Sequence, residues 1–275
     1  PLFKGRITAI EADFPEGSAP RITVLAEDRL QDLRMTRRTR VFEQQSLADI
    51  ARTIAGDHGL DPDIRLTDEA RATIAQLNLS DLAFLDGEAG VLGAEVRIAQ
   101  GRLTLDVAGR GTAIPLRWSG TLRDFRASAD LAGQRTAITA AGWDHGQKAA
   151  ATHEATPAIL ASELEGGESG PALLERAFGE RPDTLAHLAP ATAAEARALA
   201  EAAMRTRARH FLSGEGTAET DPALRAGATV ALSGLGPLFD GDWRLTAVTH
   251  LFDTQEGARS HIRCTRAGLG RGGQA

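Results

Sequence analysis

Large apolar and polar residues alternate in the first part of the chain. The alternation is clearest from Ile10 to Phe14 within residues 3–14, and it returns in residues 21–26 (Arg-Ile-Thr-Val-Leu-Ala). The residues between them, Pro-Glu-Gly-Ser-Ala-Pro, are turn-forming. A period of two predicts a strand with one buried face. We therefore expect the two segments to form an antiparallel hairpin.

A helical pattern begins after Ser46. Leu47, Ile50, Ala51 and Ile54 make an apolar stripe, and Asp49 stands three positions after Ser46. A serine followed by an acidic residue at this spacing is a variant of the capping box. We expect a helix over residues 47–55 that ends at the glycines in 56–59.

A second helix and a second hairpin are expected before residue 110. Residues 78–81 (Asn-Leu-Ser-Asp) are a helix start, and the glycines in residues 86–90 should keep that helix short. Residues 94–98 and 102–107 alternate around Gln-Gly, which predicts a β-hairpin. Together these patterns indicate a small α/β unit.

The rest of the chain is β-like, then helical, then β-like again. Strand patterns run from 114 to 144, and residues 192–209 are rich in helix formers. We expect residues 165–171 (Glu-Gly-Gly-Glu-Ser-Gly-Pro) to be a flexible loop and the glycine-rich tail from Gly268 to be mobile. Further strands are expected at 228–232, 243–252 and 260–266.

The order of these elements predicts an α+β fold. Helical segments interrupt β segments that are expected to pack with one another, and the strict strand–helix alternation of a parallel sheet is missing. Apolar residues make up 42% and charged residues 25% of the 275 positions, the balance of an ordinary globular protein. The chain opens Pro-Leu-Phe-Lys-Gly, so we expect it to begin partway into a longer protein.

Charge and cysteine usage exclude several classes of protein. The formal net charge is −6, whereas a general nucleic-acid binder would usually be basic. Cys264 is the single cysteine, so a disulfide within the chain and a cysteine-based metal site are both excluded. No run of about 18 apolar residues is present, so no membrane span is expected.

The sequence contains no convincing glycine loop or metal site. Gly234 and Gly236 are followed by Phe239 where a phosphate loop would have its third glycine, so a bent turn is predicted. His250 and His261 lie on two arms of one predicted hairpin and could face each other, but no carboxylate stands at ligand spacing beside them. His145, His153 and Glu154 form no HExxH pattern either. We predict no metal and no cofactor.

Nucleophiles and basic clusters also favour a structural interpretation. No G-x-S-x-G elbow is present. Alternation places Arg263 on the face opposite Cys264, which is expected to be a small core or interface residue. The basic cluster Arg34, Arg37, Arg38 and Arg40 has no interleaved aromatics, so we expect a solvated face or an inter-subunit salt bridge. No catalytic residue is predicted.

The sequence resembles the phage late control protein D family in a series of short blocks. The blocks, in chain order, are residues 2–11, 19–20, 24–30, 39–42, 46–50, 78–85, 142–144 and 224–227, then Gly234, Leu235, Gly236, Phe239, Gly241, Trp243, Thr246, Val248, His250 and Phe252. Members of that family are tail hub proteins, related in fold to the hub half of the valine-glycine repeat (VgrG) spike proteins. Members usually carry a further segment before the equivalent of Leu2, which is missing here.

The resemblance implies two antiparallel β-barrel-like domains with an α/β insert and a helical insert. Residues 1–37 would be the remainder of the first barrel, and 38–113 a small α/β domain. Residues 114–146 and 211–268 would form the second barrel, and 147–210 the helical insert. Three subunits would then place six barrels around one axis.

The function implied is structural. A homotrimeric baseplate hub would adapt a six-fold tail tube to a three-fold spike and surround the exit channel. The expected partners are a second and third copy, the central spike protein, a tail tube or distal tail protein, other baseplate proteins, and DNA or protein cargo. The location would be the tail tip of a virion or phage-like particle assembled in the bacterial cytoplasm.

Two alternatives remain open. A hub-associated cell-wall hydrolase would need paired carboxylates in a cleft, and Glu163, Glu165 and Glu168 cluster, although in the predicted loop. The other alternative is a monomeric β-barrel binding module. The parent particle is also open: a contractile phage, a long flexible-tailed phage, a gene transfer agent, a tailocin or an injection system.

Overall fold

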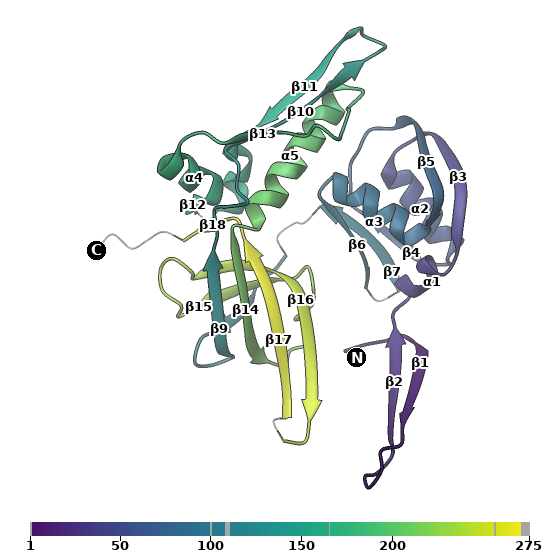
Figure 1. The fold of residues 1–275 in the computed structure, drawn as a ribbon, viewed down its shortest axis with the longest axis vertical. Coiled ribbons are helices and arrows are strands. Elements are labelled where there is room, and N and C mark those ends of the chain that lie inside the picture. The colour runs from purple at the N-terminus through teal and green to yellow at the C-terminus, as the bar shows by residue number, and fades with distance from the viewer. Residues whose placement is uncertain (1, 100, 108–110, 165, 256, 271–275) are drawn as a thin grey trace. The chain divides into compact units, whose positions relative to one another are not determined.

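The computed structural model describes residues 2–99, 101–107, 111–164, 166–255 and 257–270. They fall into two compact units, residues 1–107 and 108–275 (Figure 1). Strands outnumber helices in both units, and helices lie between strand segments in the sequence. The α+β prediction is confirmed.

The first unit begins with a hairpin of two strands. β1 (Arg6–Asp13) and β2 (Arg21–Glu27) are antiparallel, with one register shift between Ile7 and Ala9. The predicted hairpin is therefore confirmed, and its loop lies where the prolines and the glycine of residues 15–20 were expected to turn the chain.

The remainder of the first unit packs three helices against two small sheets. β3 pairs antiparallel with β5, while β4 lies parallel and β6 antiparallel to β7. The elements are α1 (Leu30–Arg34), β3 (Arg37–Gln45), α2 (Leu47–Asp57), β4 (Asp61–Ile64), β5 (Arg71–Ser80), α3 (Asp81–Val91), β6 (Ala94–Ala99) and β7 (Arg102–Val107). Leu47, Ile50 and Ile54 of α2 are fully buried with Leu85 and Leu103 in one core. The stripe read from the sequence is thus the core face of α2.

Both helix starts are where the sequence placed them. Ser46 and Asp49 form a reciprocal capping box at the start of α2. The Asp68 carboxylate also accepts hydrogen bonds from the backbone N–H of Leu47 and Ala48, at 2.7 and 3.2 Å. α3 continues to Val91, so the prediction that its glycines would shorten it is wrong.

The second unit is built on a curled six-stranded sheet. Its strand order is β8-β15-β16-β17-β14-β9, antiparallel throughout except for β8 and β15. The strands are β8 (Ile114–Arg117), β9 (Leu122–Ala129), β14 (Leu212–Glu219), β15 (Thr229–Ser233), β16 (Gly241–Asp253) and β17 (Gly257–Arg266). A bridge joins Trp118, just past β8, to Leu122 of β9. The two edge strands therefore meet at one point, and the sheet has the form of a half-barrel.

The inner face of this sheet is an apolar core. Trp243 is fully buried and meets Phe125 edge-on, with ring centroids 5.5 Å apart. Its indole N–H donates to the backbone oxygen of Phe239 at 2.9 Å, which satisfies the one polar atom of the ring. Leu245 and Ile262 complete the centre of the cluster.

A helical layer lies between β9 and β14 in the sequence. The long helix α5 (Ala193–Arg209) packs against the hairpin β10 (Ala137–Asp144) and β11 (Ala149–Ala155), as Figure 1 shows. The short elements are η1 (Pro157–Glu163), β12 (Glu168–Ser169), α4 (Gly170–Phe178) and β13 (Pro182–Thr184), and β18 (Gly268–Leu269), which follows β17 in the sequence, pairs with β12. The Thr192 hydroxyl caps α5 by accepting from the N–H of Glu195. The predicted helix over 192–209 is confirmed.

Two predictions in this layer are wrong. Residues 166–171 are not simply a loop, because β12 pairs with β18 and Ser169 caps α4. The tail is therefore paired at Gly268, while residues 165 and 271–275 lie outside the described part of the chain. A Cβ on Gly167 would collide with the backbone oxygen of Leu269, so the close approach of the two strands depends on glycine.

Candidate functional site

The β1–β2 hairpin separates apolar from polar residues by face. Ile10 pairs with Val24 and Ala12 with Ile22, so these side chains share one face. The register shift near Ala9 places Ile7 on the same face, and alternation extends it to Phe14. We call Ile7, Ile10, Phe14, Ile22 and Val24 the hairpin apolar face; their exposed fractions are 65, 67, 75, 70 and 53%.

The opposite face of the hairpin is mainly polar. Glu11 pairs with Thr23 and Asp13 with Arg21 across the two strands. Leu25, opposite Ala9, is the large apolar residue on that side and is 43% exposed. The hairpin is thus amphipathic although both of its faces are in contact with solvent in the isolated chain.

Ion pairs attach the base of the hairpin to α1. Arg6 Nη1 lies 2.9 Å from Asp32 Oδ1, and Arg34 Nη2 lies 2.7 Å from Glu27 Oε2. Arg29 approaches the other oxygen of Asp32 at 3.2 Å. These exposed pairs set the direction of the hairpin where it leaves the first unit, but each is worth little in stability.

The predicted basic cluster is paired within the chain. Arg40 lies 2.7 Å from Asp81 and 2.9 Å from Asp57, and Arg38 lies 3.2 Å from Asp57. Arg34 also has an internal partner, as described above. Arg34 and Arg37 are exposed, as a solvated face predicts, whereas Arg38 and Arg40 are half-buried and paired within the chain, so the prediction is wrong for these two.

Asp81 is the buried centre of this cluster, with 1% of its side chain exposed. Gln76 Nε2 donates to it at 2.9 Å and His58 Nε2 lies 2.8 Å away. Burial disfavours the charged carboxylate, but the hydrogen bonds of Gln76 and His58 and the charges of Arg40 and Arg38 outweigh it. They hold the pKa of Asp81 below its usual value, so the carboxylate joins β3, α2, β5 and α3 electrostatically.

Sequence reasoning did not find the Asp81 cluster. Asp81 was recognised only as part of a helix start, and its partners on β3 lie about forty positions earlier. The available signal was that Arg38 and Arg40 stand two positions apart in a strand, so that both side chains lie on one face. No pattern along the chain identifies the acid that this face meets.

The two histidines of the β16–β17 hairpin do not face each other. His250 is opposite Ser260, whereas His261 is opposite Thr249, so the two rings lie on different faces of the sheet. His250 Nδ1 lies 2.7 Å from Ser260 Oγ, and His261 Nδ1 lies 3.2 Å from Thr217 Oγ1. Within the described ranges, no three His, Cys, Asp or Glu side chains are grouped as metal ligands would be.

Cys264 and the Gly234 turn are as predicted. Cys264 is 1% exposed, and this burial raises the pKa of its thiol to about 12. Gly234 and Gly236 both have positive φ, as a bent turn requires. The Asp240 carboxylate accepts a hydrogen bond from the backbone N–H of Leu235 at 2.7 Å. A phosphate bound at this turn would need such N–H donors for itself, and it would meet the negative charge of Asp240.

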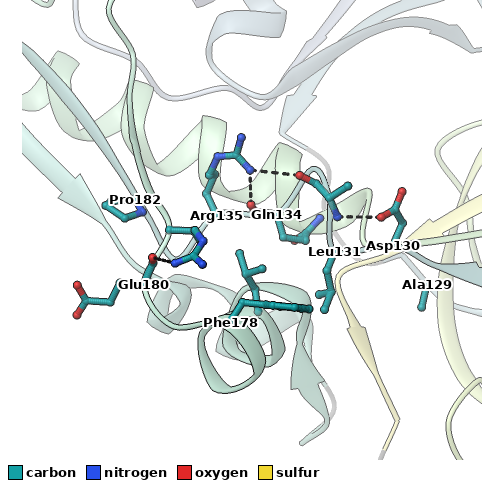
Figure 2. Close-up of a pocket in the computed structure, with 11 residues that line it drawn as sticks. Ala129, Asp130, Leu131, Gln134, Arg135, Phe178, Glu180 and Pro182 are labelled. Atoms are coloured by element: carbon teal, nitrogen blue, oxygen red, sulfur yellow. Dashed lines mark hydrogen bonds between the residues drawn. The ribbon is translucent and has the colours of Figure 1, made fainter.

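A cavity of about 780 Å³ lies in the second unit beside α4 (Figure 2). Phe178, 60% exposed, lies at its edge. Arg135 donates to the backbone oxygens of Ala132 and Gln134, and Arg181 donates to that of Glu180. The guanidinium groups therefore fix the loops around the cavity. Asp130 and Glu180 lie at opposite ends of the view in Figure 2.

The glutamates considered for a hydrolase are engaged elsewhere. Both oxygens of Glu163 accept from Arg209 at 2.8 Å, and Glu168 pairs with Arg176 at 3.0 Å. Neither residue lines the cavity. Glu165 lies outside the described residues. The described helices include none that is long and apolar enough to cross a membrane.

Comparison with solved structures identifies similar folds. The 43 kDa tail protein of prophage MuSo2 from Shewanella oneidensis aligns with a TM-score of 0.69 at 14% identity, over 95% of this chain and 77% of that one. A tail protein from Neisseria meningitidis aligns with a TM-score of 0.65 at 15% identity, over 96% of this chain and 80% of that one. The E. coli c3393 protein, a component of the type VI secretion system, aligns with a TM-score of 0.55 at 15% identity, over 95% of this chain and 60% of that one.

Identities this low show a shared fold, and the fold is that of phage tail proteins. No curated protein matches the sequence significantly. Among family models, the one described as the Alg8 N-terminal domain matches residues 1–253. Membership of the late control protein D family therefore stays a prediction. Because the matched model covers most of the sequence, this chain belongs to the Alg8 N-terminal domain family.

Proposed function

We propose that this chain is a structural subunit of the baseplate hub of a phage tail or phage-like injection particle. The observation that carries the proposal is the fold: 95% of the chain aligns with a prophage tail protein at a TM-score of 0.69. The sequence blocks shared with the late control protein D family point the same way. On this proposal the chain is a hub of that family's type.

The mechanism is geometric. Three copies close into a ring, and each contributes two β-barrel-like domains. The six similar domains match the six-fold symmetry of the tail tube. The three subunits match the three-fold symmetry of the spike. The second domain is proposed to span residues 114–146 and 211–268, and the half-barrel sheet supplies its strands from residues 114–129 and 212–266. Residues 1–37 contribute to the first domain. The α/β unit of 38–113 and the helical layer of 147–210 are inserts. Closed rings satisfy every copy of an interface at once.

The partners follow from this geometry. They are two further copies of the chain, the central spike protein, a tail tube or distal tail protein, and other baseplate proteins, with DNA or protein cargo passing along the axis. The particle is assembled in the bacterial cytoplasm and carries the hub at its tail tip.

A structural role is favoured over hydrolysis of cell-wall material. Paired catalytic carboxylates need a free cleft between them. Here both oxygens of Glu163 are held by Arg209, and Glu168 faces Arg176. A monomeric binding module is disfavoured for a different reason, because five large apolar side chains of one hairpin face are more than half exposed in the single chain.

The test is the mass and symmetry of the purified protein. Light scattering after size-exclusion chromatography should give three times the chain mass of 29.0 kDa. Negative-stain images should show rings with a central opening. A chain that stays monomeric at every concentration, alone and with its spike, would contradict the proposal.

A further inference from the structure

The cavity beside α4 has the size of a small-ligand site. Its volume of about 780 Å³ lies within the range of roughly 300–1,000 Å³ that ligand pockets have. One wall is the segment that follows β9, and the other is the end of α4 together with residues 180–182. The hub function gives this cavity no role, so the groups around it must show what it could hold.

Hydrogen bonds hold the two walls in place. Gln134, almost completely buried, donates from Nε2 to the backbone oxygen of Arg207 at 2.8 Å. The N–H of Thr136 donates to the backbone oxygen of Arg181 at 3.1 Å, and the N–H of Arg181 donates to the Thr136 hydroxyl at 2.8 Å. The first wall is thus tied to α5 and to the second wall. A ligand would enter a preorganised site, which lowers the free-energy cost of binding.

One part of the cavity is apolar and open to solvent. Phe178, the last residue of α4, is 60% exposed at the edge of the cavity. Leu174, one turn earlier in α4, is buried, and Leu131 on the other wall is half-buried. An apolar group in the cavity would cover the exposed ring, and the gain in free energy would be proportional to the apolar area removed from water.

Two guanidinium groups supply positive charge. Arg135 donates from Nη1 to backbone oxygens, and its Nε lies 3.8 Å from Asp183, so its charge is partly balanced. Arg181 donates from Nη1 to the backbone oxygen of Glu180 at 2.7 Å, and no carboxylate in the described ranges lies within ion-pair distance of it. Because a guanidinium has five N–H donors, Arg181 retains donors for a ligand.

The two acids of the cavity do not pair with Arg181. One carboxylate oxygen of Asp130 accepts from the backbone N–H of Ala132 at 2.8 Å. Figure 2 shows Asp130 and Glu180 at opposite ends, with the side chain of Glu180 extending away from Phe178. The cavity therefore combines a guanidinium that has no acidic partner with an apolar surface.

We propose that this cavity binds a carboxylate carried on an aromatic or branched aliphatic group. A guanidinium binds a carboxylate through two parallel N–H donors, and Arg181 supplies them. Phe178 and Leu131 cover the apolar group. Small organic acids have this chemistry, and so does the C-terminal residue of a polypeptide. The proposal does not depend on the hub function, because it uses only contacts within the second unit.

Titration with N-acetylphenylalanine tests the site. The readout is the backbone amide chemical shifts of the isotope-labelled full chain, and the matched ligand is N-acetylphenylalaninamide, which lacks the charge. The acid should shift the amides of Gln134, Phe178 and Arg181 with a dissociation constant of about 1 mM or below. The amide should bind about tenfold more weakly. Equal affinities, or shifts confined to residues outside the cavity, would overturn the proposal.

Substitutions test the polar and apolar parts separately. Arg181→Gln should weaken binding of the acid about tenfold and leave the amide unchanged, since only the acid pairs with the guanidinium. Phe178→Ala should weaken both ligands. Arg123→Gln is the control, because Arg123 is exposed on β9 and does not line the cavity. All three side chains are exposed, so circular dichroism should show unchanged folds. An unchanged affinity of Arg181→Gln for the acid would refute the carboxylate site.

A peptide separates the two sources of the ligand. A short flexible peptide that ends in phenylalanine is titrated with a free and with an amidated C-terminus. A free-acid peptide that binds more tightly than N-acetylphenylalanine would support the C-terminus of a partner chain, whereas weaker or equal binding would support a small organic acid. Failure of both the peptide and N-acetylphenylalanine to bind would refute the proposal and leave the hub function intact, because mass and ring symmetry test that function.

Discussion

Arg40 and Asp81 form an ion pair of 2.7 Å in which the carboxylate is almost completely buried and the arginine is 22% exposed. The pair joins β3 to the first turn of α3. Removing one partner of a buried ion pair leaves the other charge buried without compensation. The loss of stability is larger than when apolar residues replace both partners. The stability of the first unit should therefore depend on this contact more than on any surface ion pair.

Replacing the buried acid should be strongly destabilising. Asp81→Asn keeps the shape of the side chain but leaves Arg40 and Arg38 without their buried counter-charge. We expect a loss of about 3 kcal/mol in the free energy of unfolding, measured by urea titration. Arg52→Ala, which removes the exposed Asp49–Arg52 pair, is the control and should cost less than about 1 kcal/mol. Equal losses would contradict the prediction.

The same carboxylate should make stability depend on pH. The pKa of Asp81 is lowered in the folded state. Its contribution is therefore complete above the unfolded-state pKa of about 3.9 and is lost as the pH falls toward the folded-state pKa. The urea midpoint of the wild type should fall more steeply below about pH 4 than that of Asp81→Asn. Parallel curves for the two proteins would show that another group titrates.

The capping box of α2 should be measurable as well. Ser46→Ala removes the hydroxyl that accepts the N–H of Asp49, and should cost about 1 kcal/mol. Thr53→Ala lies in the same helix, where the exposed Thr53 hydroxyl bonds only to the backbone oxygen of Asp49. That control should change the unfolding free energy by less than about 0.5 kcal/mol. A neutral Ser46→Ala would mean that the Asp68 carboxylate caps the helix alone.

The pairing of β12 with β18 depends on a glycine. Gly167→Ala would place a methyl group against the backbone oxygen of Leu269 and should cost about 1–3 kcal/mol or separate the two strands. Gly133→Ala is the control, because a Cβ there would meet nothing within 4 Å. The readouts are the Tm and the hydrogen exchange of the Gly268 region. Unchanged exchange and Tm in Gly167→Ala would contradict the described contact.

The single thiol should be inert in the native protein. Burial raises the pKa of Cys264 to about 12, so almost no thiolate is present at pH 8. Ellman's reagent should react with it only after unfolding, at a rate set by the unfolding reaction. Rapid labelling of the native chain would mean that β14 or β17 opens locally.

Elements determined by local pattern were predictable from the sequence. The first hairpin, α2 and α5 were each indicated by apolar periodicity together with a turn or a cap. The start of α4 could also have been recognised, because Ser169 followed by Gly170 and Pro171 is an N-cap with proline in the first turn. It was missed because the preceding glycines suggested a loop.

The remaining features depend on contacts that no local pattern contains. α3 runs through Gly87 because Phe84, Leu85 and Ala89 are buried in the core, and this packing outweighs the low helix propensity of glycine. The histidine pair was misjudged by one position: the turn sets Asp253 opposite Gly257, which puts Ser260 and not His261 across from His250. A one-residue difference in register moves a side chain to the other face.

The half-barrel sheet is assembled from distant parts of the chain. Its edge strands β8 and β9 are made first and share the single bridge between Trp118 and Leu122, yet the strand partner of β8 is β15 and that of β9 is β14, and the central strands β16 and β17 end at Arg266. On the ribosome, β8 and β9 must wait for more than eighty further residues before a partner emerges. Folding of the half-barrel sheet is therefore postponed until residues 212–266 have been made, and nascent chains that end before them expose unpaired strand edges, the state in which chaperones bind and aggregation begins.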